Sequence, residues 1–153
     1  MERVAVEDAP GADSETRRFR SLASALDTTG LAINYFDVAP GEPVGYCYHR
    51  HHEQEEVFFV LSGTATFDIE EGDVVVDTGE AIRFAPGEWQ QGWNHGDERL
   101  VVLALGAPRE DGPTDLRRDC PECGDRTPVT PENIDGERVF HCDECGAEMG
   151  RFG

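Results

Sequence analysis

Four cysteines near the C-terminus stand in two pairs with a spacing that suits one metal ion. Cys120 and Cys123 enclose two residues, Cys142 and Cys145 enclose two more, and the 18 residues 124–141 lie between the pairs. This spacing is typical of a tetrahedral four-cysteine zinc site, because thiolates are soft ligands that suit zinc. Two disulfides or a redox-active Cys-x-x-Cys are the alternatives. Few apolar residues lie nearby to build a core without metal, so the pattern favours zinc.

The residues between and beside these pairs predict a small β-structure around the metal. Asp135-Gly136 is typical of a two-residue hairpin turn, and residues 138–141 form a strand-like segment that leads into the second pair. Gly124 and Gly146 follow the second cysteine of each pair, where a tight knuckle needs a left-handed backbone. We therefore expect a small zinc ribbon over residues 119–153.

A second group of metal-binding residue types lies near the middle of the chain. His49 and His51 are two positions apart, so on a strand their side chains point to the same face. Glu56 begins the next strand-like segment, which can fold back beside them. Two imidazoles and a carboxylate that leave coordination positions open suit Fe(II), Mn, Ni or Zn.

The elements that would position these side chains are short strands. Turn pairs such as Pro40-Gly41 and Pro86-Gly87 separate eight alternating or apolar segments. These segments are 31–38, 44–51, 56–61, 64–70, 73–77, 81–85, 89–94 and 99–105. Strands of this length and spacing predict a β-sandwich or barrel. Upstream, Phe19, Leu22 and Leu26 lie three and four apart, which predicts a short amphipathic helix.

Over residues 31–107 the sequence resembles the cupin family. The first cupin motif has two histidines, a glutamate five residues after the second and a glycine seven residues further on. His49, His51, Glu56 and Gly63 match it. The resemblance implies an all-β fold, the double-stranded β-helix or jelly-roll cupin barrel, whose strands alternate between inward and outward side chains.

The second cupin motif is matched only in part. Pro86-Gly87 and Asn94 stand in its places, but Gln90 occupies the position of its histidine. The resemblance implies that Gln90 and Asn94 face one cavity with the two histidines, with Gln90 as a fourth metal ligand or a hydrogen-bonding neighbour. An amide oxygen binds most transition metals more weakly than an imidazole. Three alternatives therefore stay open: a divalent metal site, a metal-free pocket that hydrogen-bonds a ligand, and a polar core without a ligand.

The domain organisation follows from these assignments. We expect an N-terminal arm with the short helix at 1–30, the cupin barrel at 31–107, a linker at 108–118 and the zinc ribbon at 119–153. The start of the chain lacks the basic and apolar regions of a signal peptide, and every apolar run is too short to cross a membrane. These features predict a cytoplasmic protein.

The charge balance is strongly acidic. The chain has 32 Asp and Glu against 13 basic residues, all of them Arg, for a net charge of −19. Molar salt shortens the screening length to about 3 Å, so such a surface suits a salt-rich cytoplasm and predicts a halophilic protein. An acidic protein of ordinary habitat is the alternative. Nucleic acid is not an expected partner, because within residues 111–153 only Arg117-Arg118 offers adjacent basic groups for phosphates.

Two hypotheses for function follow from the two sets of metal-binding residues. In the first, the barrel binds a metal and a small molecule without catalysis, and the ribbon contacts a protein partner. In the second, a cupin metalloenzyme of dioxygenase or isomerase type acts on a small organic acid, sugar or phenol. The resemblance also implies a homodimer. A fold used for so many activities does not fix the reaction.

Overall fold

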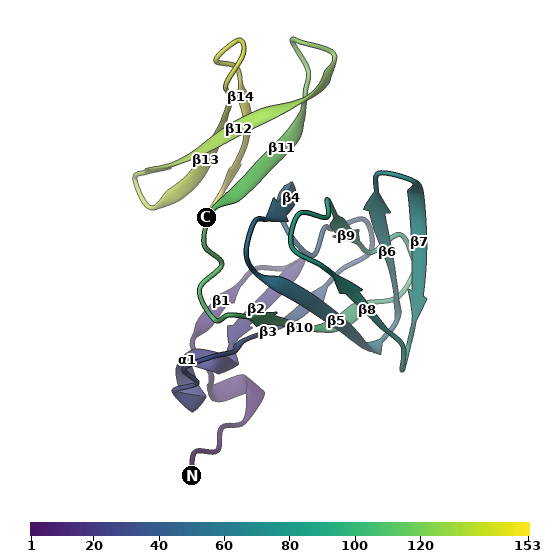
Figure 1. Ribbon diagram of the computed structural model, residues 1–153, viewed down its shortest axis with the longest axis vertical. Coiled ribbons are helices and arrows are strands. Elements are labelled where there is room, and N and C mark those ends of the chain that lie inside the picture. Colours follow the sequence, from purple (N-terminus) through teal and green to yellow (C-terminus); the bar gives the residue numbers. More distant parts are fainter.

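Strands make up most of the chain in the computed structural model, which describes residues 1–153 (Figure 1). The helical elements are η1 (Val6–Asp8) and α1 (Leu22–Leu26), and no helix is long and apolar enough to cross a membrane. The strands are β1 (Gly11–Asp13), β2 (Arg17–Ser21), β3 (Ala32–Val38), β4 (Tyr48–His51), β5 (Glu55–Ser62), β6 (Thr64–Ile69), β7 (Gly72–Asp77), β8 (Ala81–Phe84), β9 (Gln91–Trp93), β10 (Leu100–Ala107), β11 (Thr114–Cys120), β12 (Asp125–Ile134), β13 (Glu137–Cys142) and β14 (Glu148–Phe152).

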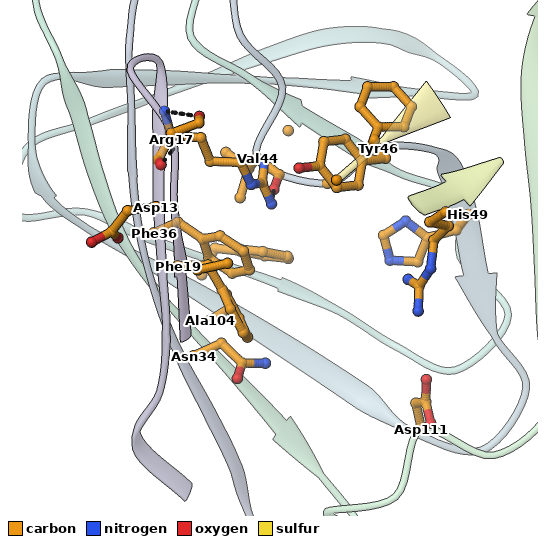
Figure 2. A pocket seen from close by; sticks show the side chains of 18 of the residues that line it. Asp13, Arg17, Phe19, Asn34, Phe36, Val44, Tyr46, His49, Ala104 and Asp111 are labelled. Atoms are coloured by element: carbon orange, nitrogen blue, oxygen red, sulfur yellow. Dashed lines mark hydrogen bonds between the residues drawn. The ribbon is translucent and has the colours of Figure 1, made fainter. Parts of the chain in front are cut away.

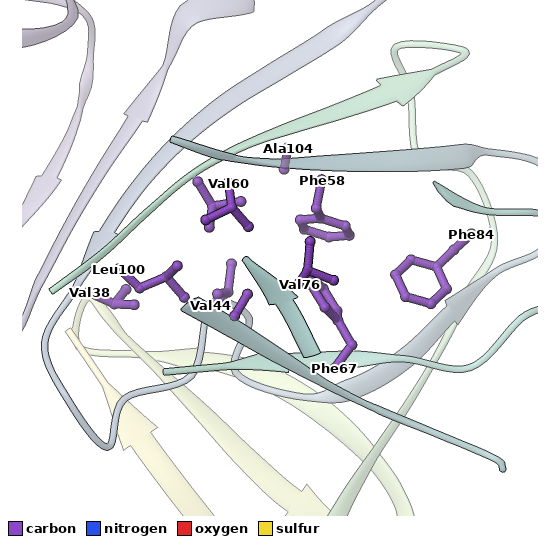
Figure 3. Close-up of a cluster of buried hydrophobic side chains, with 11 residues drawn as sticks. Val38, Val44, Phe58, Val60, Phe67, Val76, Phe84, Leu100 and Ala104 are labelled. Carbon is purple, nitrogen blue, oxygen red and sulfur yellow. The ribbon is translucent and has the colours of Figure 1, made fainter. Parts of the chain in front are cut away.

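The barrel is a jelly roll, as the sequence predicts. All eight expected strands are present as β3 to β10. Seven of them lie in sheets ordered β1-β2-β3-β10-β5-β8 and β7-β6-β9, and β4 pairs with β11 in a third sheet. Along β10 every second residue from Leu100 is buried, because successive side chains of a strand point to opposite faces. Eleven buried apolar residues, including Phe58, Phe67 and Val102, form the core (Figure 3).

Gly63 joins β5 to β6 at the glycine of the first cupin motif. Its φ of +82° lies in the left-handed region, and a Cβ there would come within 2.6 Å of the Arg99 carbonyl oxygen. Only glycine fits both conditions without strain. This glycine therefore serves the turn that keeps β5, the strand bearing Glu56, against its neighbours.

The N-terminal arm contains a hairpin in addition to the expected short helix. Residues of β1 and β2 form an antiparallel hairpin whose second strand pairs with β3. Phe19 lies opposite Phe36 with ring centroids 5.3 Å apart, so it packs on the sheet and not on a helix. The helix α1 keeps Leu22 and Leu26 but spans one short turn of five residues. The arm thus widens the barrel sheet.

The segment expected to be a linker, 108–118, contains most of β11. This strand pairs with β4, and Thr114 lies opposite His51 while Leu116 lies opposite His49. One sheet, ordered β14-β13-β12-β11-β4, therefore runs from the C-terminal unit (β11–β14) into the barrel strand that carries the histidines. In Figure 1 this unit stands over the β4 end of the barrel.

The C-terminal unit shares a core with the barrel. Cys47 is buried in one cluster with Cys120, Phe140, Cys142 and other residues of the unit. The predicted Asp135-Gly136 turn joins β12 to β13, with φ values of +53° and +87° that suit a tight two-residue hairpin. The unit is thus a hairpin-based fold attached to the barrel by both a sheet and a core.

Candidate metal centres and the adjoining cavity

The three metal-binding residues of the first cupin motif converge as expected. His49 and His51 project from β4, and Glu56 projects from β5. Each imidazole Nε2 lies 3.4 Å from the same Glu56 Oε2. The three side chains are between 11% and 17% exposed, so the group is largely withdrawn from water.

Gln90 completes this group from the opposite side. Its backbone forms a reciprocal pair of hydrogen bonds with His49, and its side chain is almost fully buried. The amide Nε2 donates to Glu56 Oε2 at 2.9 Å and lies 3.1 Å from His49 Nε2. Rotating the amide by 180° would present its oxygen at the same place. Gln90 thus lies within hydrogen-bonding distance of both Glu56 and His49.

Hydrogen bonds behind the imidazoles set which nitrogen faces the centre. His49 Nδ1 lies 3.0 Å from the Cys47 carbonyl oxygen, which can only accept, so Nδ1 carries the proton. His51 Nδ1 lies 2.8 Å from the hydroxyl of Thr114 on β11, and that hydroxyl donates to the Gly112 carbonyl. The Thr114 oxygen is then free to accept from His51 Nδ1. With Nδ1 carrying the proton, each imidazole in its neutral form has its Nε2 lone pair directed inward, as metal ligands do.

The charges of this group depend on one another. Burial raises the pKa of the Glu56 carboxyl, but hydrogen bonds and charges from His49 and His51 outweigh it and lower the pKa from 4.5 to about 2. Burial lowers the pKa of His49, but its interactions with Glu56 and the Cys47 carbonyl raise it overall. The site therefore holds an anionic carboxylate and attracts a positive charge, either a proton or a metal ion.

The spacing of the donor atoms fits a divalent metal. Metal bonds of about 2.1 Å to nitrogen and oxygen place adjacent donors about 3.0 Å apart in octahedral and about 3.4 Å apart in tetrahedral geometry. The contacts among His49, His51, Glu56 and Gln90 range from 2.9 to 3.4 Å. A metal bound by all four groups would need the Gln90 amide to turn over, so that its oxygen faces the centre.

The four cysteines form a second candidate centre. Cys120 Sγ lies 3.6 Å from Cys145 Sγ, and Cys123 Sγ lies 3.9 Å from Cys142 Sγ. A disulfide would need about 2.05 Å, so these sulfurs are not bonded to each other. Zinc–sulfur bonds of about 2.3 Å in a tetrahedron place the sulfurs about 3.8 Å apart. The four thiols therefore have the spacing of a tetrahedral zinc site.

A side-chain hydrogen bond supports a thiolate at one of the four cysteines, Cys142. The Thr127 hydroxyl lies 3.1 Å from Cys142 Sγ, and this hydrogen bond lowers the pKa of the Cys142 thiol to about 6. Gly124 and Gly146 adopt φ values of +71° and +77°, which confirms the expected left-handed knuckles. Both second cysteines of the pairs are exposed, whereas Cys120 and Cys142 are buried.

A cavity of about 650 Å³ adjoins the barrel centre. His49, Glu56 and Gln90 form part of its wall. Figure 2 shows His49 and Tyr46 on one side of this space and Arg17, Phe19 and Phe36 on the other. Volume and aromatic walls of this kind are typical of small-molecule sites.

Three parts of the chain build this cavity, and sequence reasoning found only one. The N-terminal hairpin contributes Arg17 and Phe19, and the C-terminal unit contributes Asn133, Arg138 and Phe152. No local pattern marks these residues, because they reach the barrel only through the pairing of β2 with β3 and of β11 with β4.

Asn94 does not face the cavity, which corrects the expectation from the second cupin motif. Its side chain is fully buried and donates hydrogen bonds to the carbonyl oxygens of Val38 and Glu98. An amide satisfied in this way closes a loop of the barrel and has no donor left for a ligand.

Comparison with known proteins agrees with this architecture. Residues 34–106 match the family model described as a cupin domain, which agrees with the jelly-roll barrel that these residues form. None of the curated proteins compared with the chain matches it.

Solved structures with similar folds come from several bacteria. One is a sugar phosphate isomerase of the cupin superfamily from Silicibacter pomeroyi, with 16% identity over 95% of this chain and 90% of that chain and a TM-score of 0.63. A polyketide cyclase from Streptomyces resistomycificus has 23% identity over 74% and 83%, with a TM-score of 0.62. A predicted oxalate decarboxylase from Thermotoga maritima has 21% identity over 69% and 98%, with a TM-score of 0.59. At these identities the likeness establishes the fold.

Proposed function

We propose that this protein binds a divalent metal in its cupin barrel and a small molecule in the cavity beside it. His49, His51 and Glu56 hold the metal, and Gln90 supplies an amide oxygen as the fourth group. One observation carries the proposal: two inward Nε2 atoms, a carboxylate and an amide converge with metal-like spacing at the wall of a cavity of about 650 Å³. Fe, Mn, Ni and Zn all suit this donor set.

We propose in addition that the four cysteines bind a structural zinc. The C-terminal unit has few buried apolar residues of its own, and two of its six-member core cluster are zinc-site cysteines. Metal binding would then contribute most of the stability of β11–β14. A protein partner for this unit, a homodimer, a cytoplasmic location and a salt-rich habitat remain predictions from the sequence.

The arrangement divides the chemistry between the metal and the chain. A bound divalent ion would act as a Lewis acid toward an oxygen atom of the ligand. His49 and His51 are oriented by the Cys47 carbonyl and the Thr114 hydroxyl, so the coordination geometry is fixed before a ligand arrives. The aromatic walls exclude water and orient a flat or apolar ligand body.

A metalloenzyme of isomerase or dioxygenase type is the second candidate. The structural neighbours include enzymes named as sugar phosphate isomerase, polyketide cyclase and predicted oxalate decarboxylase. Turnover needs an acid or base in reach of the ligand, and Tyr46 and Asp111 are titratable groups in the cavity wall. The expected substrate class is a small organic acid, sugar or phenol. Conversion of a bound compound to a product would favour this candidate over reversible binding.

Metal analysis of the purified full chain tests the proposal. We expect two metal equivalents per chain in the wild type, loss of one in a His49→Ala, His51→Ala double variant, and loss of the zinc in Cys120→Ala. His52→Ala, which alters a neighbouring histidine paired with Asp115 outside the centre, is the matched control and should keep both. A double variant with the same metal content as the wild type would contradict the barrel site.

A further inference from the structure

We propose that the C-terminal unit supplies the anion-binding residue of the barrel cavity, Arg138, and that the ligand is a small aromatic oxyanion. This inference rests on the proposed binding of a small molecule in the cavity and names the class of that molecule. Arg138 lies on β13, yet it lines the same cavity as His49 and Gln90.

Arg138 differs from most of the other arginines because its guanidinium has no hydrogen-bond or ion-pair partner in the protein. Seven arginines pair with carboxylates, and others donate to backbone carbonyls or lie over the Trp89 ring. The paired ones are Arg18, Arg20, Arg50, Arg83, Arg99, Arg126 and Arg151. The Arg138 side chain makes no hydrogen bond or ion pair, a property it shares with Arg3 and with Arg117, which lies over the Trp89 ring; neither of these two lines the cavity. Arg138 is exposed to solvent, so its N–H donors are free to bind an anion that enters the cavity.

The position of Arg138 is fixed by its own sheet. It lies opposite Phe152 in the pairing of β13 with β14. The Phe152 ring stacks on Tyr46 of the barrel with centroids 4.1 Å apart, and both rings line the cavity. The hairpin therefore places Arg138 at the junction of the two units. A guanidinium presents parallel N–H donors that match the two oxygens of a carboxylate or phosphate.

The remaining walls indicate the body of the ligand. Phe19, Phe36 and Phe58 come from β2, β3 and β5, and they line the cavity together with Tyr46 and Phe152. Aromatic rings favour a flat apolar partner through stacked or edge contacts. A ring between these walls with its anionic group at Arg138 satisfies both features.

The other charged groups around the cavity determine whether neutralising a residue should strengthen or weaken anion binding. Arg17 is bound to the carbonyl oxygens of Pro43 and Val44, and Asp13 is paired with Arg20 at 2.6 Å. Asp111, from the segment between the barrel and β11, lines the cavity and makes no ion pair. Asp111 would repel an anion, so neutralising it should strengthen anion binding, whereas neutralising Arg138 should weaken it.

Binding measurements on the metal-loaded full chain test this proposal. The probes are benzoate and phenyl phosphate, as the two oxyanion forms, with benzyl alcohol as the neutral counterpart. We expect at least one anion to bind about tenfold or more tighter than benzyl alcohol, and Arg138→Gln to weaken it by about ten- to a hundredfold. Arg138→Lys should recover part of the loss, and Asp111→Asn should tighten binding.

Arg151→Gln is the matched control, because it removes an arginine of the same unit that pairs with Glu137 and Glu148 away from the cavity. Failure of all three probes to bind, equal binding of anions and alcohol, or an anion preference unchanged in Arg138→Gln would overturn the proposal. Metal content, measured on the same samples, reports separately on the proposed barrel centre, so the two proposals can fail independently.

Discussion

Replacing Thr114 by valine is expected to weaken metal binding in the barrel without touching a metal ligand. Valine keeps the shape of threonine but has no hydroxyl. In the wild type that hydroxyl lies 2.8 Å from His51 Nδ1 and donates to the Gly112 carbonyl. Without it, the Nδ1–H of His51 loses its acceptor, and the imidazole is no longer held with Nε2 toward Glu56.

The size of the effect follows from the role of this contact. Loss of a hydrogen bond behind a metal-bound histidine costs about 10- to 100-fold in metal affinity, which corresponds to about 1.4 to 2.8 kcal/mol. The free energy of unfolding should fall by only about 1 kcal/mol, because the variant loses one hydrogen bond and β11 keeps its backbone pairing with β4.

Titration of the zinc-loaded chain with Mn²⁺ measures this affinity, with free Mn²⁺ read from its electron paramagnetic resonance signal. Manganese prefers oxygen and nitrogen donors, so the four thiolates do not compete for it. Thr130→Val is the matched control, since the Thr130 hydroxyl bonds Asp143 on the surface at 2.8 Å. If Thr114→Val stayed within twofold of the wild type, or if Thr130→Val lost as much affinity, the role of Thr114 would be refuted.

Three further predictions follow from the same geometry. Gln90→His restores the histidine of the second cupin motif and should tighten Mn²⁺ binding by about tenfold or more; weaker binding would show that the amide is the better fit. In metal-free protein the Glu56 pKa of about 2 means that ionised Glu56 contributes roughly 3 kcal/mol to the free energy of unfolding. This contribution is complete above pH 4.5 and is lost as the pH falls toward 2. Between pH 6 and pH 2, the free energy of unfolding in urea should therefore fall less steeply for Glu56→Gln than for the wild type. Parallel curves of this free energy against pH would contradict the lowered Glu56 pKa. Cys142→Ser should release zinc, lower the melting temperature and weaken Mn²⁺ binding in the barrel, because β11 carries Thr114; intact Mn²⁺ affinity after zinc loss would show that the two centres are independent.

Local patterns in the sequence were sufficient to predict the strands of the barrel. Strands β3 to β10 alternate apolar and polar residues and end at Gly or Pro turns, and both properties act within a few residues of chain. The Cys-x-x-Cys pairs and the His-x-His pair were also readable, because ligand geometry restricts spacing. His49, His51 and Glu56 converge because a short turn links β4 to β5, the next strand along the chain.

Contacts between distant segments were not readable in the same way. In β2, Phe19 is the one apolar residue among three arginines. The segment therefore shows no alternation of apolar and polar residues that would predict a strand. Pro108, Gly112 and Pro113 precede β11 and indicate a linker, although β4 offers that strand an open edge. Arg138 reaches the cavity only because β11 takes this edge, a pairing between positions more than 60 residues apart.

Anomalous X-ray scattering from crystals of the Mn²⁺-loaded, zinc-containing protein tests the central claim most directly. We predict one manganese peak bonded at about 2.1 to 2.3 Å to His49 Nε2, His51 Nε2 and Glu56, and one zinc peak among the four sulfurs. Manganese bound elsewhere, or a barrel centre with no anomalous density at saturating Mn²⁺, would contradict the account.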